Sequence, residues 1–148
     1  MGRVTTLKMR GDVAMSGNFG YELDLTRFSE QEKEQVRAQI AQYKELRTFI
    51  QRGDMYRLEN PFEGNEAAWM FISEDGKDIF AAYFRILSKV NQGISRMRFK
   101  ALNSDATYEV IGENRYYSGD ELMNIGLVVE LFGDFMSKTW RLREVKSE

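Results

Sequence analysis

The chain has 148 residues, enough for one domain or for one domain and a piece of another. It contains no cysteine and no histidine, which excludes disulfide frameworks, thiolate nucleophiles, serine–histidine triads and the usual zinc ligands, and we expect neither a metal nor a cofactor. The 21 lysines and arginines nearly balance the 23 aspartates and glutamates, so the net charge of −2 predicts no binding to nucleic acid or to an anionic membrane.

The N-terminal region has no apolar stretch long enough for a signal peptide, and no run in the chain approaches the roughly 18 apolar residues of a membrane helix. The expected location is therefore the cytoplasm. Residues 13–15, Val-Ala-Met, predict a short buried strand. The turn predicted after it contains Gly17, Asn18 and Gly20, because glycine and asparagine tolerate positive φ.

Residues 29–52 carry the clearest helical pattern. Ser29 and Glu32 have the spacing of a capping box, in which each side chain accepts a hydrogen bond from the other residue's main-chain N–H. Gly53 is suited to end the helix. The apolar residues recur every three or four positions and share one face. They are Val36, Ile40, Tyr43, Leu46 and Ile50. This stripe requires a large partner surface.

From residue 54 onward the apolar pattern changes to the period of two that is typical of strands. Two apolar runs, residues 67–72 and 79–87, are joined through Asp75 and Gly76, which is a strong hairpin signal. Further strands are predicted at residues 94–102, 107–111 and 135–145. A spacing of roughly ten residues with turn signals between the strands is typical of an antiparallel sandwich or barrel.

The predicted fold is therefore mainly β. An antiparallel β-sandwich over residues 54–148 follows a strand, a loop and a long helix over residues 1–53. A strand–loop–helix unit cannot bury its own faces, so we interpret residues 1–53 as the end of a larger structure.

Carboxylates are abundant, and glycoside hydrolysis requires only two of them, one as nucleophile and one as acid/base. Glu22 and Asp24 lie beside the glycine-rich turn. We interpret both as residues that solvate the loop before the helix. Aromatic residues such as Trp69 and Phe84 could stack on a sugar, but their place in continuous apolar strands favours a role in the core.

Longer stretches carry a family resemblance. One of these stretches includes Met-Ser-Gly-Asn-Phe-Gly-Tyr-Glu-Leu-Asp at residues 15–24. The stretches that carry it are residues 9–28, 39–47, 53–58, 60–62, 68–71, 117–127 and 133–142. In this order and spacing, which extends over nearly the whole chain, they resemble the C-terminal portion of the α-galactosidases of glycoside hydrolase family 36.

The resemblance implies a retaining exo-α-galactosidase that acts on melibiose, raffinose and stachyose, with these oligosaccharides as its partners. The family has a (β/α)8 barrel followed by a C-terminal antiparallel β domain. By resemblance, residues 1–53 contain the eighth strand, at residues 13–15, and the eighth helix of the barrel. Residues 54–148 would be the C-terminal domain, and the full enzyme a homo-oligomer.

Neither catalytic aspartate motif of the family occurs in the chain, so no catalytic residue is assigned and the isolated chain is predicted to be inactive. Barrel enzymes build their sites at the C-terminal ends of the strands. The residues that would follow the eighth strand are therefore the candidates for substrate binding in the full enzyme. They are Ser16, Gly17, Asn18 and Phe19.

One alternative is a stand-alone β-sandwich that binds carbohydrate or mediates assembly without catalysis. Residues 1–52 argue against it, because a binding module has no use for a lone barrel strand and helix. For the isolated chain we expect a homodimer formed through the edges of the strand at residues 13–15 and the apolar stripe of the helix. The competing outcome is that the helix folds back onto the sheet of its own chain.

Overall fold

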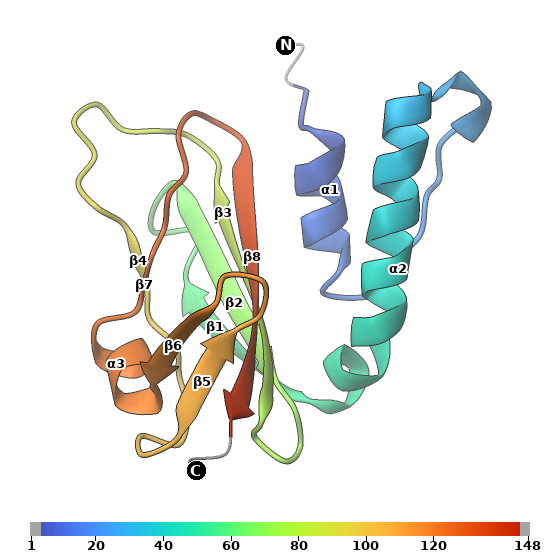
Figure 1. The fold of residues 1–148 in the computed structure, drawn as a ribbon. Coiled ribbons are helices and arrows are strands. Elements are labelled where there is room, and N and C mark those ends of the chain that lie inside the picture. Colours follow the sequence, from blue (N-terminus) through green and yellow to red (C-terminus); the bar gives the residue numbers. More distant parts are fainter. Residues whose placement is uncertain (1–3, 146–148) are drawn as a thin grey trace.

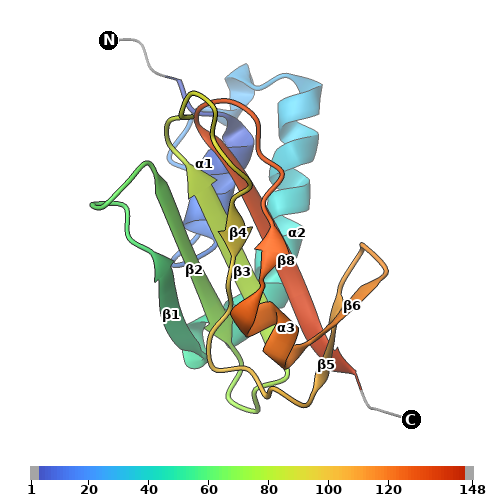
Figure 2. The same ribbon diagram turned by 90° about the vertical axis from the view of Figure 1, so that its left-hand side faces the viewer.

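The structure is a computed structural model that describes residues 4–145. A twisted antiparallel sheet lies in the middle, with two helices against one face and a smaller layer against the other (Figures 1 and 2). In chain order the elements are α1 (Leu7–Ala14), η1 (Leu25–Arg27), α2 (Glu30–Arg52), β1 (Asp54–Glu59), β2 (Glu66–Ile72), β3 (Asp78–Arg85), β4 (Arg96–Met97), β5 (Thr107–Val110), β6 (Arg115–Ser118), α3 (Gly119–Asn124), β7 (Leu127–Val128) and β8 (Met136–Val145). None of the helices in the described range is long and apolar enough to cross a membrane.

The main sheet has six strands in the order β1-β2-β3-β8-β5-β6, and every neighbouring pair is antiparallel. β2 and β3 form the predicted hairpin, in which Gly76 adopts a φ of +75° that glycine tolerates without strain. β8, near the C-terminus of the described range, pairs with β3 over the whole length of β3. The mainly β, antiparallel fold expected from the sequence is confirmed.

The central strand β3 explains why this part of the sequence is apolar without interruption. Ile79, Ala81 and Tyr83 pack into the core on the side of the smaller layer. Phe80, Ala82 and Phe84 pack into the core on the side of the helices. Because both faces of the strand are covered, the usual alternation with polar residues is absent.

The smaller layer consists of β4, β7 and α3 (Figure 2). Of the strand predicted at residues 94–102, only β4 is paired, with β7 as its partner. The predicted alternation is nevertheless present, because Met97 and Phe99 are buried whereas Arg96 and Arg98 are exposed. The pattern of the sequence therefore identified the buried face correctly and overestimated the length of the ladder.

Helix α2 begins as predicted. The Ser29 hydroxyl accepts a hydrogen bond from Glu32 N at 3.2 Å, and the Glu32 carboxylate accepts one from Ser29 N at 2.9 Å. The apolar stripe lies against its own chain: Val36, Leu46 and Ile50 are buried, and Ile40 and Tyr43 are half-buried. The structure therefore follows the competing outcome, with the helix packed on α1 and on the sheet, and the stripe is not free to form a dimer.

Gly53 separates α2 from β1 at the boundary predicted between residues 1–53 and 54–148. Its φ is −75°, so the glycine is not required for a left-handed conformation. A Cβ at this position would lie 2.3 Å from Ile72 O and 2.8 Å from Phe49 O. The glycine is instead required because the end of the helix approaches β2 too closely for a side chain. The division into two domains at this point stays a prediction.

The strand predicted at residues 13–15 is wrong. Val13 and Ala14 are helical, and Met15 caps α1 with right-handed helical dihedral angles. The Thr6 hydroxyl begins this helix by accepting a hydrogen bond from Met9 N at 3.1 Å. Three apolar residues in a row do not distinguish a strand from a helix, and the capping threonine was the signal that decided it. The strand edges expected to drive dimerisation are therefore absent at residues 13–15.

Candidate functional site

The residues predicted to bind substrate form the turn after α1. Ser16 Oγ accepts a hydrogen bond from Trp69 Nε1 on β2, and the Tyr43 hydroxyl on α2 donates to Gly17 O at 2.8 Å. The ring of Phe19 stacks on that of Tyr43, with 5.1 Å between the centroids and 22° between the planes. The turn is thus fastened to both the sheet and the long helix.

A cavity of about 490 Å³ opens where this turn meets β1 and β2. Three of the four predicted residues line it, and Phe19 does not. The lining includes Ser16, Gly17, Asn18, Arg57, Glu59 and Trp69. The amide of Asn18, the guanidinium of Arg57 and the carboxylate of Glu59 are groups that can form hydrogen bonds with sugar hydroxyls. However, the turn follows a helix and not a strand, so the reason for placing it at the catalytic end of a barrel is lost, and substrate binding here stays a prediction.

Trp69 itself is mainly a core residue, as the sequence suggested. Its ring stacks on Phe84 at a centroid distance of 4.6 Å. Phe84 belongs to the core beneath the helices, and the half-buried Trp69 packs against that core. Only its Nε1 reaches the turn at Ser16. The ring therefore fixes the wall of the cavity and is not a free stacking platform.

The other two candidates, Glu22 and Asp24, lie on the exposed connection between α1 and α2. Asp24 caps the short helix η1: its carboxylate accepts hydrogen bonds from the side chain and from the main-chain N of Thr26, the latter at 3.0 Å. These two bonds, the side-chain bond most strongly, lower the pKa of Asp24. Within residues 4–145, no hydrogen bond or ion pair engages the carboxylate of Glu22.

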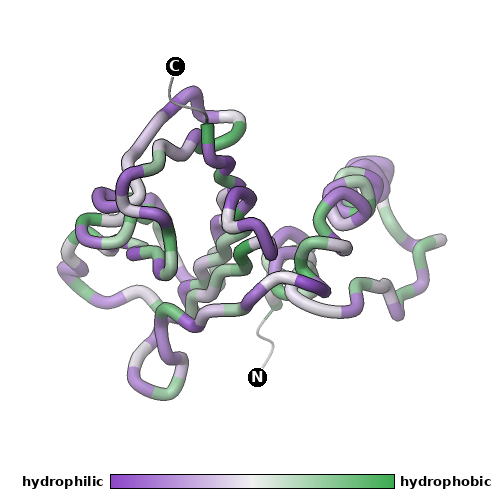
Figure 3. The backbone as a smooth tube through the Cα atoms, turned by 90° about the horizontal axis from the view of Figure 1, so that it is seen from below, coloured by the Kyte–Doolittle hydropathy of each residue, from purple (hydrophilic) through white to green (hydrophobic). Residues whose placement is uncertain are grey.

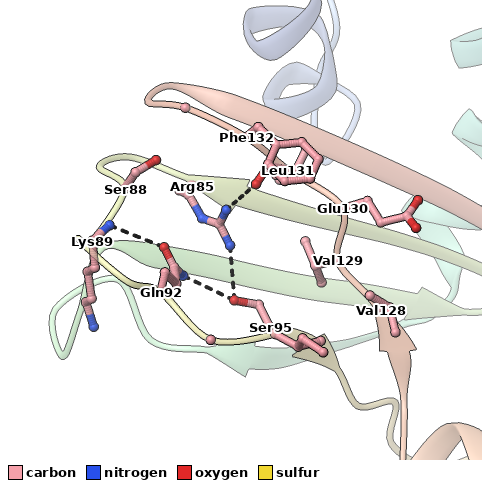
Figure 4. A pocket seen from close by; sticks show the side chains of 13 residues that line it. Arg85, Ser88, Lys89, Gln92, Ser95, Val128, Val129, Glu130, Leu131 and Phe132 are labelled. Atoms are coloured by element: carbon pink, nitrogen blue, oxygen red, sulfur yellow. Dashed lines mark hydrogen bonds between the residues drawn. The ribbon is translucent and has the colours of Figure 1, made fainter.

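A second cavity, of about 410 Å³, lies at the opposite side of the sheet and was not foreseen from the sequence (Figure 4). The buried Arg85 guanidinium donates to Leu131 O, to Ser95 Oγ at 3.0 Å and to Glu66 Oε1 at 3.0 and 3.1 Å. Gln92 Nε2 donates to the same carboxylate oxygen at 2.7 Å. These residues come from four separate segments, so no local spacing in the sequence could reveal the cluster.

The electrostatics of this cluster indicate a structural role. Burial acts to raise the pKa of Glu66, but hydrogen bonds from Tyr83, Arg85 and Gln92 outweigh it and lower that pKa. Burial and the bond to Glu66 raise the pKa of Tyr83 to about 12. Both groups are thus held in their ordinary ionisation states near neutral pH, where neither can exchange protons with a substrate. The network fastens two loops to the sheet.

No metal site is apparent in the part of the chain that the structure describes: none of its acidic side chains gather in groups of three or more that could hold an ion.

Comparison with known families assigns both parts of the chain. The sequence model of the glycosyl hydrolase family 36 C-terminal domain matches residues 66–142, which contain the smaller layer and the main sheet apart from β1 and the end of β8. The chain belongs to glycosyl hydrolase family 36. A second model, Melibiase, matches residues 1–53, which contain α1 and α2. The family membership inferred from the sequence is confirmed.

Several relatives in this family are α-galactosidases. The α-galactosidase AgaA of Geobacillus stearothermophilus is 50% identical over 147 residues, which are 99% of this chain and 20% of that protein. α-Galactosidase 1 of Pediococcus pentosaceus is 36% identical over 145 residues, or 97% of this chain and 20% of that protein. The chain thus spans about a fifth of the length of the curated relatives it matches.

Solved structures of the family share the whole arrangement. The crystal structure of AgaA superposes with a TM-score of 0.93 over 98% of this chain and 20% of that one, at 51% identity. The α-galactosidase from Lactobacillus brevis gives 0.93 over 100% of this chain and 21% of that one, at 36% identity. The helices pack on the sheet here as they do within enzymes of roughly five times this length.

Proposed function

We propose that the chain is the C-terminal part of an α-galactosidase that releases terminal non-reducing α-D-galactosyl residues from galacto-oligosaccharides such as melibiose, raffinose and stachyose. The observation that carries the proposal is the superposition of 98% of the chain, helices and sheet together, on an α-galactosidase of 50% identity. Structures of AgaA variants hold raffinose and stachyose. In a retaining reaction one carboxylate forms a glycosyl-enzyme, and a second acts first as acid and then as base.

The isolated chain is expected to be inactive. Retaining enzymes place two carboxyl groups about 5–5.5 Å apart on the two sides of the bond that is cleaved. In this chain Asp24 is engaged by Thr26, Glu22 stands alone, and neither catalytic motif of the resembled family occurs. What this part contributes is the frame on which the catalytic part is completed.

The test is a hybrid enzyme in which this chain replaces the matching fifth of AgaA. Hydrolysis of a chromogenic α-galactoside and of raffinose is measured for the hybrid, for AgaA and for this chain alone. We expect the hybrid to be active and the chain alone to be indistinguishable from buffer. A folded but inactive hybrid, or activity of the isolated chain that is lost on Glu22→Gln, would contradict the proposal.

A homo-oligomeric, cytoplasmic enzyme remains part of this proposal. The stripe of α2 is covered, so the earlier reason for self-association no longer applies. Support comes instead from two exposed apolar residues, Phe132, which lines the second cavity and is 87% exposed, and Val90, which is 93% exposed. Sedimentation of the hybrid and of this chain at micromolar concentration tests the assembly, and two clean monomers would contradict it.

A further inference from the structure

The loop between β1 and β2 presents an aromatic side chain to solvent. Residues 60–65 project beyond β1, which is an edge strand of the main sheet (Figures 2 and 3). Phe62 in this loop is 96% exposed. The main chain beneath the ring is held in place, because Asn60 Oδ1 accepts a hydrogen bond from Phe62 N at 3.1 Å and Asn60 Nδ2 donates to Glu63 Oε1 at 2.8 Å. The ring is therefore fixed at its base and open to solvent on its faces.

Two cavities meet where β1 enters this loop. One is the cavity of about 490 Å³ beside the turn after α1, and the other is a third cavity, of about 630 Å³, which is lined by residues 57–62. Arg57, Glu59 and Pro61 line both cavities, so the two adjoin and form one groove along β1. Each volume is within the range of about 300–1,000 Å³ that small-molecule sites occupy. The groove therefore has room for a ligand of more than one ring.

The polar side chains of the groove have unused hydrogen-bonding capacity. Arg57 and Glu59 on β1 and Asn18 in the turn after α1 are all exposed. Lys100 Nζ donates to the main-chain O of Arg57 at 3.2 Å. Within residues 4–145, however, no hydrogen bond or ion pair engages the guanidinium, the carboxylate or the amide of these three side chains. The guanidinium can only donate, the carboxylate can only accept, and the amide can do both.

These groups suit a neutral ligand with hydroxyl groups better than an ion. The positive charge of Arg57 and the negative charge of Glu59 offset each other, so the groove attracts neither anions nor cations strongly. A sugar hydroxyl both donates and accepts, and can therefore bond to the carboxylate or to the guanidinium. The C–H groups on one face of a galactose ring are apolar, and an exposed aromatic ring can pack against them out of water. Phe62 offers the open ring that Trp69, which is fixed against the core, does not.

We infer that the groove along β1 binds a neutral oligosaccharide of at least two rings, with Phe62 packed on one ring and Asn18 bonded to another. Phe62 and Asn18 line different cavities of the groove, and Arg57 and Glu59 lie between them because they line both. The choice of a galacto-oligosaccharide as the ligand rests on the proposed function, whereas the geometry requires only neutral rings that carry hydroxyls.

Titration of the isotope-labelled chain with stachyose, followed by residue-resolved NMR, tests the site without any need for activity. Stachyose at millimolar concentration should shift the signals of residues 16–18 and 57–63 and leave those of residues 88–94 unchanged. Galactose, a single ring, should bind more weakly by about fivefold or more. Glycerol, which has hydroxyls but no ring, should shift no signal of the groove. Absence of shifts with stachyose, or equal shifts with glycerol, overturns the inference.

Phe62 has a matched control in Phe132, which is 87% exposed beside the second cavity. Phe62→Ala should weaken the binding of stachyose about fivefold or more, whereas Phe62→Tyr, which keeps a ring, and Phe132→Ala should not. Because both phenylalanines are exposed, these substitutions leave the fold intact, and a change in affinity reports on the ligand contact. Equal affinities of Phe62→Ala and Phe132→Ala for stachyose overturn the inference.

The AgaA hybrid separates this inference from the proposed function. An active hybrid, together with an isolated chain that gives no shifts with stachyose, overturns the inference and supports the function. Shifts in the isolated chain, together with a folded but inactive hybrid, contradict the function and leave the oligosaccharide site supported.

Discussion

The sheet and the α1–α2 unit of this chain differ in how completely each is satisfied by its own residues. β3 is paired on both edges and covered on both faces by residues of the same chain. Residues 18–23 are covered on one face and are unpaired on both edges within the described chain. The comparison teaches that the residues of the sheet satisfy one another's main-chain groups, whereas the α1–α2 connection leaves its own main-chain groups unpaired within residues 4–145.

The first prediction tests whether the stability of the sheet depends on the hydrogen-bond network around Arg85. Arg85→Met keeps the stem and removes the guanidinium, which leaves Leu131 O without this donor and the part-buried Glu66 carboxylate without its ion pair. We expect a loss of about 3–5 kcal/mol in the free energy of unfolding, measured with denaturant. The control Arg98→Met changes an exposed guanidinium and should cost about 0.5 kcal/mol or less. Equal losses for Arg85→Met and Arg98→Met would show that the stability of the sheet does not depend on this network.

The contact between the two regions is tested at Leu46. Its side chain is 1% exposed and belongs to the core shared by α2 and the sheet. Leu46→Ala should therefore cost about 3 kcal/mol, whereas Lys44→Ala on the exposed side of the same helix should change stability little. If Leu46→Ala lowers the free energy of unfolding as little as Lys44→Ala, the helix does not pack on the sheet in solution.

The pH dependence of the free energy of unfolding tests the burial of the Tyr83 hydroxyl in the sheet, and its expected effect is smaller. The folded-state pKa of Tyr83 is raised from 10.0 to about 12. The unfolded chain therefore releases this proton first, and the corresponding stability is complete below pH 10 and is lost as the pH rises toward 12. Between pH 9 and 11 we expect about 1 kcal/mol more loss in the natural sequence than in Tyr83→Phe. Parallel curves for the two proteins would contradict a buried Tyr83 hydroxyl.

The sequence predicted the elements whose partners are close in the chain or whose pattern is strong. The capping box at Ser29, the hairpin through Gly76 and the alternation at Met97 and Phe99 are all present. Each rests on residues only a few positions apart, and local spacing is what a sequence shows directly.

The remaining features depend on contacts that local spacing does not reveal. Residues 13–15 are a helix end because Thr6 caps α1 and Asp12 bonds to Ser137 Oγ at 2.7 Å, 125 positions away. Glu66 and Arg85 are brought together by the pairing of β2 with β3. Glycine and asparagine predicted the turn at residues 16–20, but they gave no sign that Phe19 stacks on Tyr43 or that the Tyr21 hydroxyl bonds to Gln39 on α2.

The most direct test of the difference between the two regions is hydrogen exchange of the isolated chain, resolved by residue. The amides of β3 should exchange only through global unfolding, and those of residues 18–23 should exchange at nearly the rate of an unstructured peptide while the flanking helix α2 stays protected. Protection of residues 18–23 comparable with that of β3 would contradict the account, because the segment would then be satisfied within the chain and would have no open edges to offer an enzyme.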